Sequence, residues 1–157
     1  MRAYDTLDQL TAPQRVAIVG ASDNPTRIGG RPISYMLNHG YTGQIFPVNP
    51  KNETVQGLPA YAQIGDIQEE IDFALIAVKS TMVADQVRAA AQKGAKTALI
   101  FSSGFAEMDK SGQALQEELV TIGQETGIRI LGPNCLGLFN ACLLYTSDAA
   151  DEGLGVD

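Results

Sequence analysis

The sequence is poor in the residues from which disulfide frameworks, zinc sites and histidine-based catalysis are built. Its 157 residues contain two Cys, Cys135 and Cys142, and one His, His39. Two Cys are too few for a disulfide framework or a Cys-based zinc site. No apolar run approaches the ~20 residues of a membrane helix. Lys and Arg number 11 against 18 Asp and Glu, a net charge of −7, so neither nucleic acid nor an anionic membrane is an expected partner.

The composition that remains is typical of one globular domain. Apolar residues make up 45% of the chain and charged residues 18%, and this length suggests a single domain with a real core. Residues 1–14 form an expected N-terminal leader, which carries acids where a signal peptide needs an apolar core. We therefore expect a cytoplasmic protein.

Five short apolar runs alternate with helical patterns, which predicts a Rossmann-like α/β fold. The predicted strands are residues 15–20, 44–48, 71–78, 96–101 and 128–131, with a loop containing Gly57 and Pro59 after the second. Helices are expected from Ile33 to Gly40, with Ile33, Met36 and Leu37 on one face, from a Ser80 cap to Gly94, and from Asp109 or Ser111 to Gly127. The prediction is a doubly wound parallel sheet of about five strands in a single domain. Ligands bind beyond the carboxyl ends of such strands, at residues 20–30, 47–51, 78–80, 102–105 and 132–137.

The loop after the first strand predicts a phosphate site. Gly20 allows a sharp turn, while Gly29 and Gly30 allow close backbone approach near the start of the next helix. Backbone N–H groups and the helix dipole there can hold a pyrophosphate. Ser22 can add a hydroxyl donor, and Arg27 or Arg31 a charged fork. The dinucleotide fingerprint G-x-G-x-x-G is not met, because Ser22 replaces its second Gly and the loop is longer. An ordinary Gly turn is the alternative.

The second predicted strand ends in Asn49-Pro50-Lys51. An NAD site needs an Asp or Glu at this point for the ribose hydroxyls. Lys51 instead suits an extra phosphate on the adenosine ribose, as in coenzyme A or NADP. The alternative is an ordinary exposed lysine.

Four motifs in series resemble a known family. They are Val19-Gly20-Ala21-Ser22 with Gly29, Pro47-Val48-Asn49-Pro50-Lys51, Ser102-Ser103-Gly104-Phe105-Ala106-Glu107 and Gly132-Pro133-Asn134-Cys135-Leu136-Gly137. In order and spacing they resemble the CoA-binding domain of ADP-forming acyl-CoA synthetases, which are related to the succinyl-CoA synthetase α subunit. The resemblance covers about residues 7–141, and residues 15–141 are the predicted CoA-binding domain.

The resemblance implies a role for each loop. The CoA pyrophosphate would be held by the first loop, through Gly20, Ala21, Ser22, Arg27 and Gly29. The adenosine 3′-phosphate would lie near Asn49, Pro50 and Lys51. Val78, Lys79 and Ser80 would line the groove, Ser102, Ser103 and Gly104 would follow the pantetheine arm, and Asn134 would lie near the thiol. In the family an acyl phosphate passes its phosphoryl group to a His and then to ADP. That His, the ATP-grasp domain, ATP or ADP, and Mg belong to further domains of the parent enzyme.

No catalytic residue is expected within the domain itself. His39 precedes Gly40 at a predicted helix end, where a His commonly caps carbonyl groups. Cys135 has no predicted neighbouring base, so a small buried residue is the better interpretation. We therefore expect a CoA-binding fragment of an acid–thiol ligase that converts acyl-CoA, ADP and phosphate to acid, CoA and ATP. By itself the fragment is expected to be catalytically silent.

Three alternatives remain at the sequence level. The CoA-binding module of a protein lysine acetyltransferase would look the same, as would the first half of a stand-alone CoA-binding protein. The motif from Gly132 to Gly137 favours the synthetase. An NAD(P)-dependent oxidoreductase domain is the third, disfavoured by the missing second Gly and by the missing acid after the second strand.

Residues 142–157 depart from the α/β pattern. They contain Asp148, Asp151, Glu152 and Asp157 and neither Lys nor Arg. The stretch resembles a translated sequencing adapter, and the interpretation is a non-native or disordered tail after Ala141, with a native acidic tail as the alternative. We exclude it from the prediction of the fold.

Overall fold

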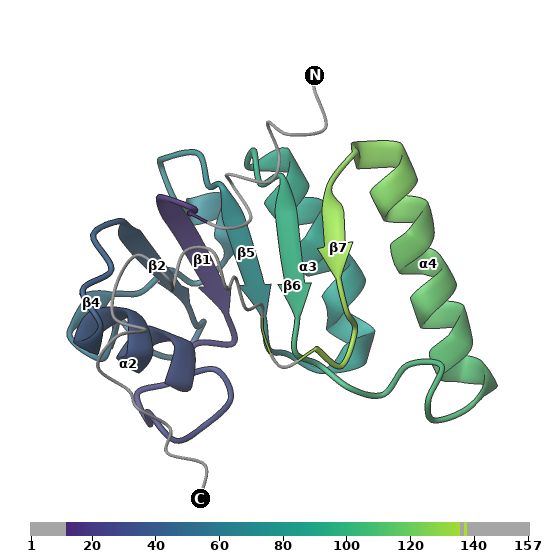
Figure 1. Cartoon of the computed structure of the whole chain (residues 1–157), viewed down its shortest axis with the longest axis horizontal. Helices are drawn as coiled ribbons and strands as arrows, with labels where there is room; N and C mark the ends of the chain where they lie inside the picture. Colours follow the sequence, from purple (N-terminus) through teal and green to yellow (C-terminus); the bar gives the residue numbers. More distant parts are fainter. Residues whose placement is uncertain (1–11, 136, 138–157) are drawn as a thin grey trace, which may run out of the picture.

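The computed structural model describes residues 12–135 and 137. Its main element is a five-stranded sheet in the order β2-β1-β5-β6-β7, in which every pairing is parallel (Figure 1). The strands are β1 (Arg15–Val19), β2 (Gln44–Val48), β5 (Phe73–Ile76), β6 (Thr97–Ile100) and β7 (Arg129–Leu131). The helices are α2 (Arg31–Asn38), α3 (Ser80–Gln92) and α4 (Lys110–Thr126), with a 3₁₀ turn, η1 (Ile64–Asp66). The Rossmann-like prediction is confirmed.

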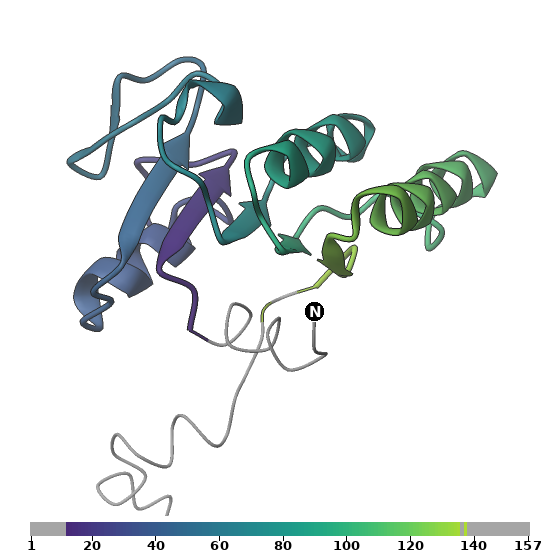
Figure 2. The ribbon, with the colours of Figure 1, turned by 90° about the horizontal axis from the view of Figure 1, so that it is seen from above.

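Helices cover both faces of the sheet, because right-handed crossovers lead from β1 to β2 in one direction across the sheet and from β5 to β7 in the other. Figure 2 shows α3 and α4 over one face and α2 over the other. The α3 and α4 face holds the larger core, in which Val83, Val87 and Ile122 pack on Ile76 and Ile100. The α2 face holds a smaller one, in which Ile33, Val16, Ile18 and Leu75 are buried together. Alternation along each strand divides β1 between the two cores.

The chain between β2 and η1 forms a hairpin that the sequence pattern did not indicate. Strands β3 (Thr54–Val55) and β4 (Leu58–Pro59) pair antiparallel through a connection of two residues, Gln56 and Gly57. Val55 is fully buried in the α2-side core. The expected loop is therefore an ordered arm anchored beside the first strand–loop–helix unit.

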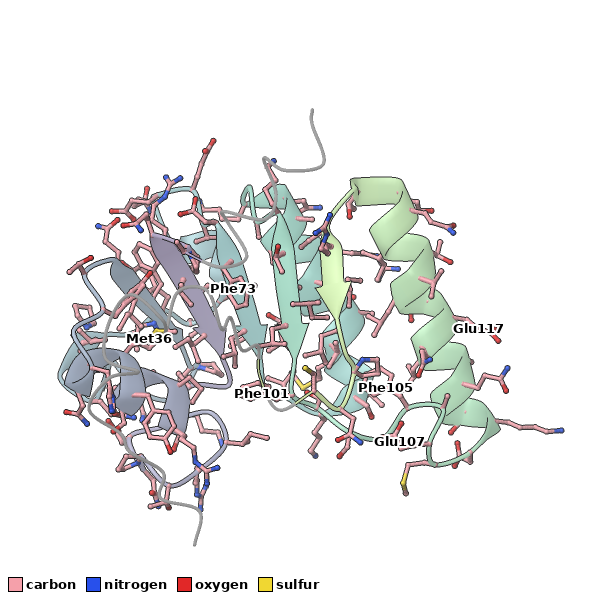
Figure 3. All side chains as sticks on the ribbon, viewed as in Figure 1. Met36, Phe73, Phe101, Phe105, Glu107 and Glu117 are labelled. Carbon is pink, nitrogen blue, oxygen red and sulfur yellow. The ribbon has the colours of Figure 1, made fainter. Side chains whose placement is uncertain are left out.

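Helix ends follow the predicted signals in part. Asp109 caps α4 by accepting from the N–H groups of Ser111 and Gly112, and Gly127 ends the helix in the left-handed region at φ 73°. Ser80 does not cap α3: Lys79 is the N-cap, without a side-chain bond, and Ser80 is the first helical residue. The expectation for Leu37 was also wrong, since its side chain is 47% exposed while Ile33 is buried. α2 is short, and the side chains that it turns towards the sheet are Ile33 and the partly buried Met36, which is labelled in Figure 3. Leu37 therefore lies outside the buried face.

Candidate functional site

A cavity of about 470 Å³ opens at the carboxyl edge of the sheet, where the strand order reverses around β1. Such a switch point is the usual ligand site of an open α/β sheet, and the volume falls in the range of ligand pockets. Nine of the predicted site residues line it: Gly20, Ala21, Ser22, Arg27, Gly29, Asn49, Pro50, Lys51 and Val78. The structure thus brings together, around one cavity, predicted residues from three separate loops.

The lining is positively charged although the protein is acidic overall. Arg27 and Lys51 are the two charged residues in it, and no Asp or Glu contributes. Within residues 12–135 neither cation takes part in an ion pair, because the pairs there join Arg15 to Asp72 and Arg88 to Asp85 and Glu118. Two cations without counter-ions beside one cavity favour an anionic ligand.

The first two amides of the loop after β1 form hydrogen bonds within the protein. The N–H groups of Gly20 and Ala21 both donate to the carbonyl oxygen of Val48, at 3.1 and 3.2 Å. Asn49 closes the same junction, since its side-chain amide donates to the Ala21 carbonyl at 2.8 Å and its oxygen accepts from the Lys51 N–H at 2.8 Å. These contacts set Lys51 at the cavity margin. They also mean that the first two amides of the loop are not available to a phosphate.

The amides that are available lie further along. In the described chain the N–H groups of Ser22, Ile28 and Gly29 have no hydrogen-bond acceptor, and all three residues line the cavity. The intervening turn is satisfied internally, through Asn24, whose side chain accepts from Thr26 and whose carbonyl accepts from Arg27. Residues that line this one cavity thus carry three amides without an acceptor and the Arg27 guanidinium, a combination suited to a pyrophosphate.

The other predicted residues form a second group on the same edge. They are Lys79, Ser80, Ser102, Ser103, Gly104 and Asn134, with Val78 common to both groups. The Ser102 hydroxyl donates to the Val78 carbonyl, and the Asn134 N–H donates to the Ser102 carbonyl at 2.9 Å. A Cβ on Gly104 would lie 3.0 Å from Ser80 Oγ, so these two residues are close neighbours. The side chain of Ser102 braces adjacent loops and is 8% exposed.

Glu107 closes the loop between β6 and α4 (Figure 3). Its carboxylate accepts from the Gly104 N–H at 2.7 Å and from the Phe105 N–H at 3.1 Å. These backbone bonds, the one from Gly104 foremost, hold the pKa of Glu107 below its usual value. Phe105 is fully buried beneath this turn. The geometry gives Glu107 a structural role in shaping the edge beside Ser80.

Several lining residues escaped the sequence prediction. They are Val19, Ile28, Val48, Ala62, Gln63, Ala77, Met82 and Gln86. Met82 and Gln86 lie four residues apart on α3 and so share a face, and Ile28 lies inside the predicted loop. Ile28 and Met82 are 51% and 48% exposed, which gives the opening apolar walls. A large apolar residue inside a polar, glycine-rich loop at a strand end was the sequence signal that could have identified Ile28.

The single His and the described Cys lie outside this cavity. His39 caps α2, with Nδ1 2.9 Å from the Tyr35 carbonyl oxygen, as the sequence predicted. Cys135 is half-buried and its thiol lies 3.4 Å from the Gly137 carbonyl oxygen. Residues 12–135 and 137 contain no cluster of three or more metal-ligating side chains. In the same part of the chain no helix is long and apolar enough to span a membrane. The predicted tail, 142–157, and most of the predicted leader lie outside the described residues.

Fold and cavity together define a nucleotide-cofactor-binding domain of the Rossmann-like class. The chain belongs to the family described as CoA binding domain, whose pattern matches residues 14–141. The recognised resemblance to ADP-forming acyl-CoA synthetases is also confirmed. The α subunit of the ADP-forming acetate–CoA ligase II of Pyrococcus furiosus is 35% identical over 134 residues, which cover 85% of this chain and 29% of that subunit.

Two further comparisons agree. A trans-feruloyl-CoA synthase from an unknown prokaryotic organism is 39% identical over 134 residues, covering 85% of this chain and 19% of that enzyme. The apo structure of the dinucleotide-forming acetyl-coenzyme A synthetase 1 of Ca. Korarchaeum cryptofilum superposes with a TM-score of 0.76 at 35% identity, covering 82% of this chain and 28% of the other. The chain thus spans less than a third of the length of each of these three relatives.

Proposed function

We propose that this chain binds coenzyme A in the cavity at the carboxyl edge of the sheet, as the CoA-binding unit of an ADP-forming acyl-CoA synthetase. The observation that carries the proposal is the lining of that cavity. Arg27 and Lys51 face it without any carboxylate, next to three backbone amides that have no acceptor in the described chain. A ligand with a pyrophosphate and a separate ribose phosphate matches this charge distribution.

The proposed pose follows the two groups of site residues. The pyrophosphate lies against Ser22, Gly29 and Arg27, and the 3′-phosphate lies near Lys51 after Asn49 and Pro50. The adenine base packs between Ile28 and Met82, the two exposed apolar side chains at the cavity opening. The pantetheine arm then runs past Val78, Lys79 and Ser80 along Ser102, Ser103 and Gly104, and the thiol ends near Asn134.

The chemistry of the whole enzyme is part of the same proposal. The parent converts acyl-CoA, ADP and phosphate to the free acid, CoA and ATP in the cytoplasm. The resemblance implies that its phosphorylated His and its nucleotide–Mg site belong to other domains, and His39, the single His of this sequence, caps a helix away from the cavity. In this proposal the described domain binds CoA and positions its thiol, while the other domains carry the phosphorylated His and the nucleotide site. The partners are CoA or acyl-CoA and the remaining domains of the synthetase.

Calorimetric titration of the 157-residue chain with CoA, dephospho-CoA and NAD tests the binding proposal. We expect CoA to bind most tightly and NAD most weakly, since NAD offers a bare ribose diol to Lys51. Tighter binding of NAD than of CoA would contradict the proposal and would favour an oxidoreductase domain. A second assay follows acyl-CoA formation from ATP, CoA and acetate. Turnover of ~1 s⁻¹ or more, an ordinary enzyme rate, would contradict the expected catalytic silence.

A further inference from the structure

The β3–β4 hairpin contains a residue that its turn geometry disfavours. Gln56 and Gly57 connect two short strands and have φ values of 50° and 81°, both in the left-handed region. A two-residue turn of this kind favours Asn, Asp or Gly at its first position, because a Cβ is crowded in the left-handed region and only Gly lacks it, while Asn and Asp offset the cost by local hydrogen bonds. Gly57 fits this rule and Gln56 does not. Local rules are most often broken at positions that serve a site.

The Gln56 side chain joins the hairpin to the loop between β1 and α2, residues 20–30, here named the anion loop. Its Nε2 donates to the Ser22 carbonyl at 2.8 Å and to the Gly30 carbonyl at 2.9 Å. Ser22 and Gly30 lie at the two ends of the loop that bears the available amides. One side-chain amide therefore fixes both ends at once.

A second set of hydrogen bonds joins the hairpin to the anion loop. The Gln56 N–H donates to Asp23 Oδ1 at 2.7 Å, and the Asn52 side chain donates to Asp23 Oδ2 at 3.0 Å. Asp23 does not line the cavity, and neither does Gln56. Both sets of hydrogen bonds therefore hold the loop without taking up space in the cavity. Because Val55, the residue before Gln56, is fully buried, the hairpin is a fixed support for them.

The length of the side chain explains why Gln stands at position 56. Asn would suit the turn better, but it is one methylene shorter, and an amide at that distance could not reach two carbonyls that already lie at hydrogen-bond distance from Gln. The turn strain is thus tolerated where it supplies reach. The two carbonyls belong to the Ser22–Asp23 and Gly30–Arg31 peptide groups, which are planar, so Gln56 fixes the orientation of the backbone on both sides of the residues that bear the available amides.

We propose that Gln56 is a positioning residue for the ligand site: by bonding the Ser22 and Gly30 carbonyls it holds the loop in the conformation that presents the Ser22, Ile28 and Gly29 amides to a pyrophosphate. This inference rests on the proposed binding of CoA. Gln56 touches no ligand in this arrangement and acts through the backbone of the loop.

The test compares Gln56→Asn and Gln56→Gly with the wild-type chain. Both substitutions suit the left-handed turn, and both remove the reach to the two carbonyls. Gln92→Asn, at an exposed position on α3, is the matched control for the same chemical change. Each protein is titrated calorimetrically with CoA and with dephospho-CoA. Amide hydrogen exchange is then measured for residues 22–30 and for strand β5.

We expect both Gln56 variants to bind CoA and dephospho-CoA at least threefold more weakly, by the same factor for each ligand, since net hydrogen bonds of this type are each worth a severalfold change. Exchange should become faster in residues 22–30 and stay unchanged in β5. The control should match the wild type in every measurement.

Two results would overturn the inference. One is a loss of less than threefold in both variants. The other is faster exchange of β5 to the same extent as the loop, which would make Gln56 a residue of global stability. A wild-type chain that binds no CoA contradicts the proposed function instead. The exchange comparison on the ligand-free protein then decides, by the same criterion, whether Gln56 fixes the loop.

Discussion

The backbone of Gly29 rests directly on the carbonyl group of Gly20. A Cβ built on Gly29 would lie 2.0 Å from the Gly20 oxygen, far inside any real contact. Gly20 is the first residue of the loop between β1 and α2 and Gly29 the last but one, so the two ends of the loop touch backbone to backbone. The Gly pair recognised in the sequence therefore serves the closure of the loop on itself.

Gly29→Ala should disrupt this closure. The new methyl group meets rigid backbone, so the loop must shift, at a cost of about 1–3 kcal/mol. For a domain of this size that corresponds to a Tm several degrees lower, and CoA binding should weaken with it. Gly65→Ala is the control, because a Cβ there meets nothing within 4 Å. Thermal unfolding followed by circular dichroism measures both, and equal Tm values for the two variants would contradict the close contact.

Lys51→Ala tests how CoA is distinguished from its relatives. A partly exposed Lys–phosphate contact is worth ~1 kcal/mol, so CoA should bind several-fold more weakly while dephospho-CoA is nearly unaffected. Lys93→Ala, at the far end of α3, removes the same charge away from the cavity and should change neither ligand. Calorimetry measures all three proteins. Equal losses for CoA and dephospho-CoA would remove Lys51 from the phosphate site.

Arg27→Ala should behave differently from Lys51→Ala. Arg27 lines the cavity on the loop that bears the available amides, so its guanidinium is expected at the pyrophosphate, which CoA and dephospho-CoA share. Both ligands should lose affinity by a similar factor of about ten or more, the scale of one charge-assisted hydrogen bond. Arg129→Ala, an exposed Arg on β7, is the control. A loss confined to CoA would instead assign Arg27 to the ribose phosphate.

The cap of α4 should make stability sensitive to acid. Asp109 accepts from the Ser111 hydroxyl at 2.6 Å and from the N–H groups of Ser111 and Gly112, and these bonds, the hydroxyl first, lower its pKa. A carboxyl group whose folded pKa is depressed stabilises the protein above its unfolded pKa, and this contribution is lost as the pH falls through the folded pKa. Asp109→Asn keeps a capping oxygen but cannot ionise.

Wild type and Asp109→Asn should therefore differ most in Tm at neutral pH, and the difference should shrink as the pH falls from 5 towards 3. Asp109→Ala, which removes the cap altogether, should lower Tm by several degrees at pH 7. A difference between wild type and Asp109→Asn that stays constant with pH would show that ionisation of Asp109 contributes nothing to the cap.

The sequence pattern predicted the sheet well because its central strands, β1, β5 and β6, are buried on both faces. Runs such as Val16–Val19 and Ala98–Ile100 are continuous and apolar, a pattern typical of central parallel strands. It failed where the elements are short. The β3–β4 hairpin has strands of two residues, too few for any alternation to be visible, and α2 has only two turns in which to distinguish Met36 from Leu37.

The candidate site divides in the same way. Gly20, Ser22, Arg27 and Lys51 were predicted because glycine-rich turns and cations at strand ends are local features of the chain. The commitment of the Gly20 and Ala21 amides to the Val48 carbonyl is not local, since it depends on the pairing of β1 with β2.

The sequence by itself determined the order of strands and helices along the chain, and it predicted the position of the candidate site and the cations placed there, because each of these follows from periodicity and turn chemistry within a few residues. Only the tertiary structure decided which loop amides are left without an acceptor and which contacts hold the loop. Gln56 lies 34 residues from Ser22 and 26 from Gly30 along the chain. A hydrogen bond across such a separation is set by the packing of the hairpin beside α2, and no local pattern encodes it.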